Sequence, residues 1–179
     1  CGQDYQSYEW LFRRFHDVFK VKPVSIFTDS APELDVAIRE CSTIDSDVWF
    51  GIVHNLCIFH LSQNVFDNCR KAFGPEQTED WRKLLDAFWR LAKQSDERGQ
   101  ETFQSDFQTM TDIVLNALTA ASHDNCEEHP TLKWLLTTLY DRRKKWAACF
   151  TWSTCSWGAH STQRSESWNR VTKLDVNKH

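Results

Sequence analysis

The alternation of apolar and polar residues predicts an amino-terminal segment of amphipathic helices and short strands. Apolar residues recur at three- and four-residue steps across residues 8–19, which is the spacing of an amphipathic helix. Residues 24–28 form a short apolar run that ends at Asp29, as a buried strand would. A second apolar run, residues 48–56, predicts another strand, and residues 59–72 predict a helix after it. Strands alternating with helices in this way indicate the α/β class.

The helix between the two strands is predicted to begin directly after Asp29. Ser30 and Glu33 have the Ser-x-x-Glu spacing of a capping box, and Pro32 lies in the first turn, where its missing N–H costs nothing. The apolar face of this helix is formed by Leu34, Ala37, Ile38 and Cys41. Asp29 therefore lies where a strand ends and a helix begins, which is where sites gather in open α/β sheets. Aspartate is also common at helix starts, so position alone does not assign it a function.

The chain changes character after Gly74 and Pro75, where long helical periodicity begins. Polar stretches at residues 94–101 and 122–130 are predicted to be linkers between three helical segments, and a polar helix is predicted over residues 162–174. The apolar stripes of the three segments are Trp81, Leu84, Leu85, Phe88 and Leu91; Phe103, Phe107, Met110, Ile113, Val114 and Leu118; and Leu132, Leu135, Leu136, Leu139 and Tyr140.

Composition predicts a substantial core and no membrane segment. The 179 residues are 41% hydrophobic and include nine tryptophans, which is ample material for one packed domain. No apolar run is long enough to cross a bilayer, so no membrane partner is expected. The formal net charge of -4 is not that of a basic nucleic-acid-binding domain, so any contact with DNA would depend on local clusters. The seven cysteines are odd in number and scattered, which favours reduced thiols.

Cysteine and histidine offer one weak metal-binding pattern. Cys57 and His60 have the Cys-x-x-His spacing of a ligand pair, and His54 lies three residues before Cys57. A structural zinc site needs four ligands, and the remaining cysteines and histidines form no second close pair. A buried cysteine beside a hydrogen-bonded histidine explains the pattern equally well.

Two groups of basic residues are candidates for contact with DNA phosphates. Four adjacent cations precede Trp146: Arg142, Arg143, Lys144 and Lys145. Arg164 and Arg170 flank Glu166, which shares one face of the predicted polar helix with Arg170. Solvated helix ends also carry such clusters, because cations interact favourably with the helix dipole, so both interpretations stay open.

Five segments, taken together and in their order, resemble the transposase domain of Mutator-like elements. The resemblance runs from about Trp10 to about Lys173, and its most specific part is the last segment joined to the upstream "RRKKW". The segments are "FTD" at residues 27–29, "PELDVAIRE" at 32–40, "LCIFHLSQN" at 56–64, "YDRRKKWAACF" at 140–150 and "STQRSESWN" at 161–169.

This resemblance implies a variant of the RNase H-like fold and the chemistry of a DDE-type recombinase. In such enzymes three carboxylates hold two Mg²⁺ or Mn²⁺ ions, which activate water or a 3′-hydroxyl for attack on a DNA phosphodiester. Asp29 matches the second acid of the family, at the end of the fourth core strand, and Glu166 matches the last acid, on a helix after an all-α insertion. Cys57 and His60 match the family's C-x-x-H signature.

The resemblance also divides the chain into three parts. Residues 1–73 would form the first part of a partial RNase H-like core, and residues 74–148 would form the all-α insertion. Residues 149–179 would complete this α/β core with the final helix, which carries Glu166. The first acid of the family would lie upstream of Cys1, so we expect this chain to be a fragment that is inactive by itself.

Two other functions are compatible with the same residues. The implied partners of a transposase are the terminal inverted repeats of its element and target DNA, with a nuclear location and room for a homo-oligomer. A domesticated relative would keep the fold and the acids but act as a DNA-binding transcription regulator without catalysis. A zinc-stabilised helical interaction module using His54, Cys57 and His60 is the third hypothesis.

Overall fold

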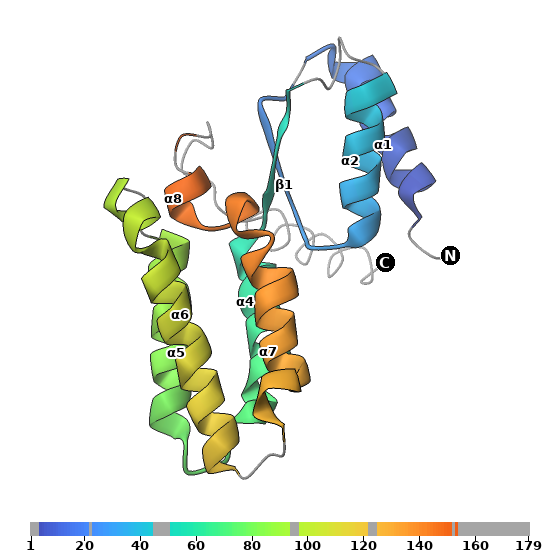
Figure 1. Ribbon diagram of the computed structural model, residues 1–179. Helices are drawn as coiled ribbons and strands as arrows, with labels where there is room; N and C mark the ends of the chain where they lie inside the picture. The colour runs from blue at the N-terminus through green and yellow to red at the C-terminus, as the bar shows by residue number, and fades with distance from the viewer. Residues whose placement is uncertain are drawn as a thin grey trace, which may run out of the picture. The chain divides into compact units, whose positions relative to one another are not determined.

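The computed structural model describes residues 4–21, 23–44, 51–93, 97–121, 125–151 and 153. These residues are mostly helical and include a two-stranded parallel sheet, so they have the mixed α/β character that the sequence predicts (Figure 1). The chain forms two compact units, and it passes from the first to the second at Leu61 and Ser62. This division concerns compactness alone, and the three-part domain scheme stays a prediction.

The first unit begins with a helix pair. Helix α1 spans Tyr5–Phe19 and packs against α2, which spans Pro32–Ile44. Helix α1 starts three residues before the predicted residue 8, because Asp4 caps it: the Ser7 amide donates a hydrogen bond to Asp4 Oδ1 at 2.8 Å. The helix ends at Lys20, which has a left-handed φ of 53° and donates its N–H to the carbonyl of His16.

Strands β1 (Ser25–Thr28) and β2 (Val53–Leu56) run parallel, with α2 as the crossover between them. Ser25 lies opposite Val53 at one end of the ladder, and Thr28 lies opposite Leu56 at the other. Ile26 packs against the small core of this unit, whose buried members are Phe12, Leu34, Ala37, Ile38 and Cys41. The predicted apolar face of α2, formed by Leu34, Ala37, Ile38 and Cys41, is therefore confirmed.

The second strand is shorter than the sequence predicts. It starts at Val53, whereas the apolar run had suggested a start near residue 48. Gly51 forms a turn with a φ of +77°, a conformation that side-chain-bearing residues rarely adopt and that interrupts extended chain. Residues 45–50 lie outside the described part of the chain.

The regular secondary structure described in the second unit is all helical, and turns join the helices. Helix α4 begins at the end of the first unit and continues into this one, and η1 follows it, so the helix predicted over residues 59–72 is confirmed. Helices α5 and α6 pack against each other, and both contact α8. The elements are α4 (Ile58–Cys69), η1 (Arg70–Ala72), α5 (Thr78–Lys93), α6 (Glu97–Ala120), η2 (Cys126–Glu128), α7 (Pro130–Trp134), the π-helical η3 (Leu135–Tyr140), η4 (Arg143–Lys145) and α8 (Ala148–Thr151).

Three details of the helical prediction were wrong. Helix α6 already begins at Glu97, within the predicted linker of residues 94–101, because a polar helix start has the same composition as a linker. The other linker, residues 122–130, contains the short helix η2. Leu136 was placed on the apolar stripe with Leu132, Leu135 and Leu139 but is 51% exposed. The π-helical segment η3 winds more loosely than an α-helix, which shifts the phase of the stripe.

Trp146 anchors the end of the second unit in an aromatic cluster. Its side chain is buried, and its ring stacks on Phe88 at 5.6 Å between centroids and meets Phe103 edge-on at 6.2 Å. Its indole N–H donates to the carbonyl of Leu139 at 2.8 Å, which satisfies the polar atom of a buried ring. The tryptophan of "RRKKW" is therefore a core residue.

We expect Trp146→Phe to lower the free energy of unfolding by about 1–3 kcal/mol, because the Leu139 carbonyl loses its buried donor while most of the ring packing remains. Urea unfolding followed by circular dichroism would measure the change. Trp89→Phe is the matched control, since this half-buried ring makes no indole hydrogen bond that the described residues record. Equal losses in both variants would show that the Leu139 contact contributes nothing.

Candidate functional site

The parallel sheet brings two separate sequence segments to one edge. Asp29 directly follows β1, and Cys57 directly follows β2. The backbone N–H of Cys57 donates to the carbonyl of Thr28 at 2.7 Å, which extends the ladder past the last paired residues. His60 lies in the first turn of α4. "FTD" and "CIFH" therefore lie side by side at the carboxyl ends of the strands, where α/β folds place their sites.

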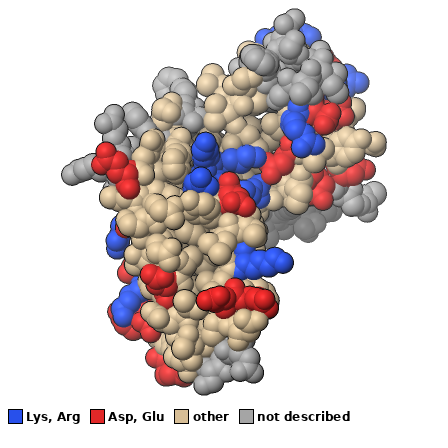
Figure 2. All heavy atoms as spheres, viewed as in Figure 1, with Lys and Arg blue, Asp and Glu red and all other residues tan. Residues whose placement is uncertain are grey.

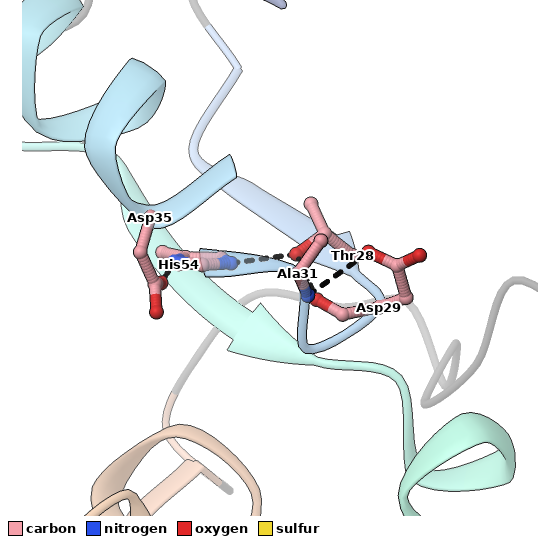
Figure 3. A network of polar contacts seen from close by, with 5 residues as sticks. All are labelled: Thr28, Asp29, Ala31, Asp35 and His54. Carbon is pink, nitrogen blue, oxygen red and sulfur yellow. Dashed lines mark hydrogen bonds and ion pairs between the residues drawn. The ribbon is translucent and has the colours of Figure 1, made fainter. Parts of the chain in front are cut away.

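Asp29 is exposed at this edge and is fixed by its neighbours. Its Oδ1 accepts a hydrogen bond from the Ala31 N–H at 3.3 Å, at the start of α2 (Figure 3). Tyr8 lies near enough to Asp29 to feel its charge. Burial raises the pKa of the Tyr8 hydroxyl, and the negative charges of Asp29 and Glu33 raise it further. Asp29 can therefore both accept a hydrogen bond at the start of α2 and bind a ligand, because Oδ1 accepts from the Ala31 N–H while the side chain remains exposed to solvent.

Next to Asp29 lies a polar network that the sequence did not reveal (Figure 3). His54 on β2 places Nδ1 2.9 Å from Oδ1 of Asp35 on α2, and Nε2 2.7 Å from Oγ1 of Thr28. The Thr28 hydroxyl in turn donates to the carbonyl of Asp29 at 2.8 Å. The His54 side chain is only 8% exposed. The aspartate and the histidine are 19 positions apart, so only the crossover brings them together.

Cys57 and His60 have the surroundings of packing residues. Cys57 is fully buried, and the ring of His60 meets that of Phe59 edge-on at 5.6 Å between centroids. Both ring nitrogens of His54 lie within hydrogen-bond distance of protein oxygens, so this histidine would have to leave them to bind zinc. Within the part of the chain that the structure describes, no three His, Cys, Asp or Glu side chains are grouped closely enough to hold a metal ion.

Asn55 is a second polar residue that the sequence analysis missed. It is 1% exposed and lies opposite Phe27 in the sheet. Neither its side-chain oxygen nor its nitrogen has a hydrogen-bond partner among the described residues. The signal was present in "IVHNLCIF", where an asparagine interrupts an apolar run, but nothing in the pattern indicated which face it occupies.

The second predicted acid lies outside the described residues. Glu166, the flanking Arg164 and Arg170, and the helix predicted over residues 162–174 all fall in residues 154–179, which the structure does not describe. The convergence of Asp29 and Glu166 is therefore still a prediction.

The basic cluster divides into structural and exposed members. The Arg143 guanidinium lies over the Tyr140 ring, 4.2 Å from its centroid, and donates to the Tyr140 carbonyl at 3.0 Å. Arg142 and Lys145 are half-buried, whereas Lys144 is exposed. On the face seen in Figure 2, basic and acidic side chains are intermixed. Lys144 is thus the most exposed member of this cluster.

The donor chemistry at Asp29 suits a divalent ion of the kind that the resemblance implies. An exposed carboxylate is a hard oxygen ligand, which Mg²⁺ and Mn²⁺ prefer. Among the residues described, Asp29 is the one carboxylate of the expected set, and it does not make a site alone.

Comparisons with known proteins gave no relative for this chain. A scan against models of known families found no match, and searches of curated proteins and of solved structures found no significantly similar protein. Among the described residues, no helix combines the length and the apolar character needed to span a membrane.

We expect Asn55→Leu to raise the free energy of unfolding by about 1–3 kcal/mol, because it removes a buried amide that has no described partner and keeps a similar volume. Urea unfolding would measure the change. Asn68→Leu is the control, since the Asn68 amide donates to the Asn64 carbonyl at 2.7 Å and its loss should destabilise the protein. A loss of stability in Asn55→Leu would mean that the amide is hydrogen-bonded in the folded chain.

Proposed function

We propose that this chain carries part of the catalytic site of a DDE-type transposase similar to those of Mutator-like elements, which cuts and joins DNA strands with two divalent metal ions. The observation that carries the proposal is the position of Asp29. This exposed acid follows the first of two parallel strands, and the segment "CIFH" follows the second at the same edge. That is the juxtaposition expected if the ordered motifs belong to an RNase H-like core.

The two acids would share the work of holding the metal ions. Bound divalent ions stabilise the negative charge that develops on the attacking and leaving oxygens of a phosphodiester. Asp29 would present a carboxylate from a position fixed by β1 and the start of α2. Glu166 would supply the second carboxylate, and the first acid of the family would complete the set.

DNA is the partner that this function requires, and the nucleus is the compartment in which the protein would meet it. Among the described residues on the face seen in Figure 2, cations and acids are intermixed, so contacts with DNA there would depend on single exposed cations. Lys144 is one such cation, and Arg164 and Arg170 beside Glu166 are the other candidates.

Asp29→Asn and Glu166→Gln should each abolish Mg²⁺-dependent cleavage of DNA by the full-length gene product, because each removes a charged metal ligand. DNA affinity, measured by fluorescence anisotropy, should change little. Asp17→Asn and Glu79→Gln are matched controls on exposed acids of α1 and α5, and they should cut normally.

Normal cleavage by either site variant would refute the assignment of that acid. If the full-length gene product binds DNA but does not cleave it in the presence of any divalent metal ion, the transcription-regulator hypothesis would be favoured. Tightly held stoichiometric zinc, lost together with the fold on chelation, would favour the zinc-module hypothesis.

Lys144→Ala should weaken binding to DNA of any sequence and reduce the slope of log K against log salt concentration by about 0.9, the value for one phosphate contact. Lys83→Ala is the control, because Lys83 is already paired with Asp80 at 3.0 Å. Anisotropy titrations at several salt concentrations would measure both slopes. An unchanged slope for Lys144→Ala would remove this residue from the DNA interface.

A further inference from the structure

We infer that Asp35, His54 and Thr28 form a positioning network that fixes the backbone and carboxylate of Asp29. The part of this inference that concerns metal binding rests on the function proposed above, and the part that concerns the geometry of Asp29 does not. The network joins three elements: His54 lies on β2, Asp35 on α2, and Thr28 at the end of β1 (Figure 3).

The contacts have a defined direction. A carboxylate only accepts hydrogen bonds, so the contact of 2.9 Å between Asp35 and His54 requires a proton on Nδ1. The Thr28 hydroxyl has a single proton, and it donates to the Asp29 carbonyl at 2.8 Å. Its contact with His54 Nε2 at 2.7 Å then uses a hydroxyl lone pair.

The network acts on Asp29 through its main chain. Thr28 holds the Asp29 carbonyl through its side chain, and its own carbonyl accepts from the Cys57 N–H at 2.7 Å. On the other side, the Ala31 N–H holds Asp29 Oδ1 at 3.3 Å. The residue is thus restrained before and after its Cα, while the side chain remains exposed. Restraint of this kind is what a metal ligand needs, because a productive geometry tolerates displacements of only about 0.5 Å.

A hydroxyl, a histidine and an aspartate also occur together as nucleophile, base and orienting acid in hydrolytic triads of the Ser-His-Asp type. Two observations favour positioning here. Thr28 is 8% exposed, which leaves little of this residue accessible to a substrate, and its hydroxyl lies 2.8 Å from the Asp29 carbonyl, within hydrogen-bond distance. Asp29, the exposed group at this edge, is the residue that the network restrains.

The pair Thr28→Val and Thr28→Ser tests the network. Valine has the shape of threonine without the hydroxyl, whereas serine keeps the hydroxyl. In the metal-free chain, Thr28→Val should make hydrogen exchange at the Ala31 amide about five- to tenfold faster, the factor for one lost hydrogen bond, and Thr28→Ser should leave it close to the parent value. Exchange followed by NMR measures this amide directly, and melting temperatures show that each variant is folded.

A second pair keeps the test decisive if Thr28→Val does not fold. His54→Gln can place a polar atom where Nε2 meets Thr28, and His54→Asn can place one only where Nδ1 meets Asp35. We expect protection of the Ala31 amide to survive in His54→Gln and to fall in His54→Asn. Unchanged exchange in both His54→Asn and Thr28→Val, or equal losses in Thr28→Val and Thr28→Ser, would overturn the network.

Binding of Mn²⁺, measured by electron paramagnetic resonance, tests the link to metal. Loss of an outer partner of a metal ligand typically weakens affinity about 10–100-fold, which is the effect expected for Thr28→Val, with rescue in Thr28→Ser. Unchanged affinity in Thr28→Val, in a protein where Asp29→Asn abolishes binding, would overturn the role of the network at the metal. Unchanged affinity in Asp29→Asn itself would overturn the proposed function, and the Ala31 exchange rates would still decide the network.

Discussion

The parallel pairing of β1 with β2 is the constraint on which the candidate site depends. Because α2 crosses over between the strands, both run in the same direction and their carboxyl ends meet at one edge. The bond from the Cys57 N–H to the Thr28 carbonyl continues this pairing to the point where Asp29 begins. Each strand has only four residues, so the ladder itself is short. The contacts of His54 with Asp35 and Thr28 add side-chain ties across the same three elements.

The segment "RRKKW" contributes to the fold of the second unit. Trp146 is buried against Phe88 and donates to a backbone carbonyl, and Arg143 lies over the Tyr140 ring and donates to a carbonyl as well. Two of its five residues are therefore explained by packing within the second unit. Lys144 is the exposed member of this segment, and a nucleic-acid role for it needs a separate argument.

The sequence predicted the helices and strands well where apolar periodicity determined them. It predicted them less well where a polar stretch could be either a helix start or a linker. The buried stripe of α5 follows from spacing alone, and the place of Asp29 between strand and helix follows from an apolar run ending before a proline-containing start. The early start of α6 at Glu97 could not be distinguished from a linker, because polar residues suit both.

The site was predictable only as a list of residues. The position of Asp29 at a strand end could be expected, since it depends on neighbours in sequence. The network around His54 could not, because its three members come from three elements and meet only after the crossover forms. Asn55 showed the same limit: its type was visible in an apolar run, but its burial depends on which face of the sheet it occupies.

The end of β1 combines two properties that a ligand position needs and that usually oppose each other. An exposed side chain is accessible to a ligand, but it is usually less ordered than a buried one. Side chains of successive strand residues point in opposite directions, so Thr28 can be buried while the next residue, Asp29, is exposed. The buried hydroxyl then restrains the exposed acid through the peptide carbonyl that follows it. The buried Thr28 side chain thus restrains the main chain of Asp29, while the Asp29 carboxylate remains exposed to solvent.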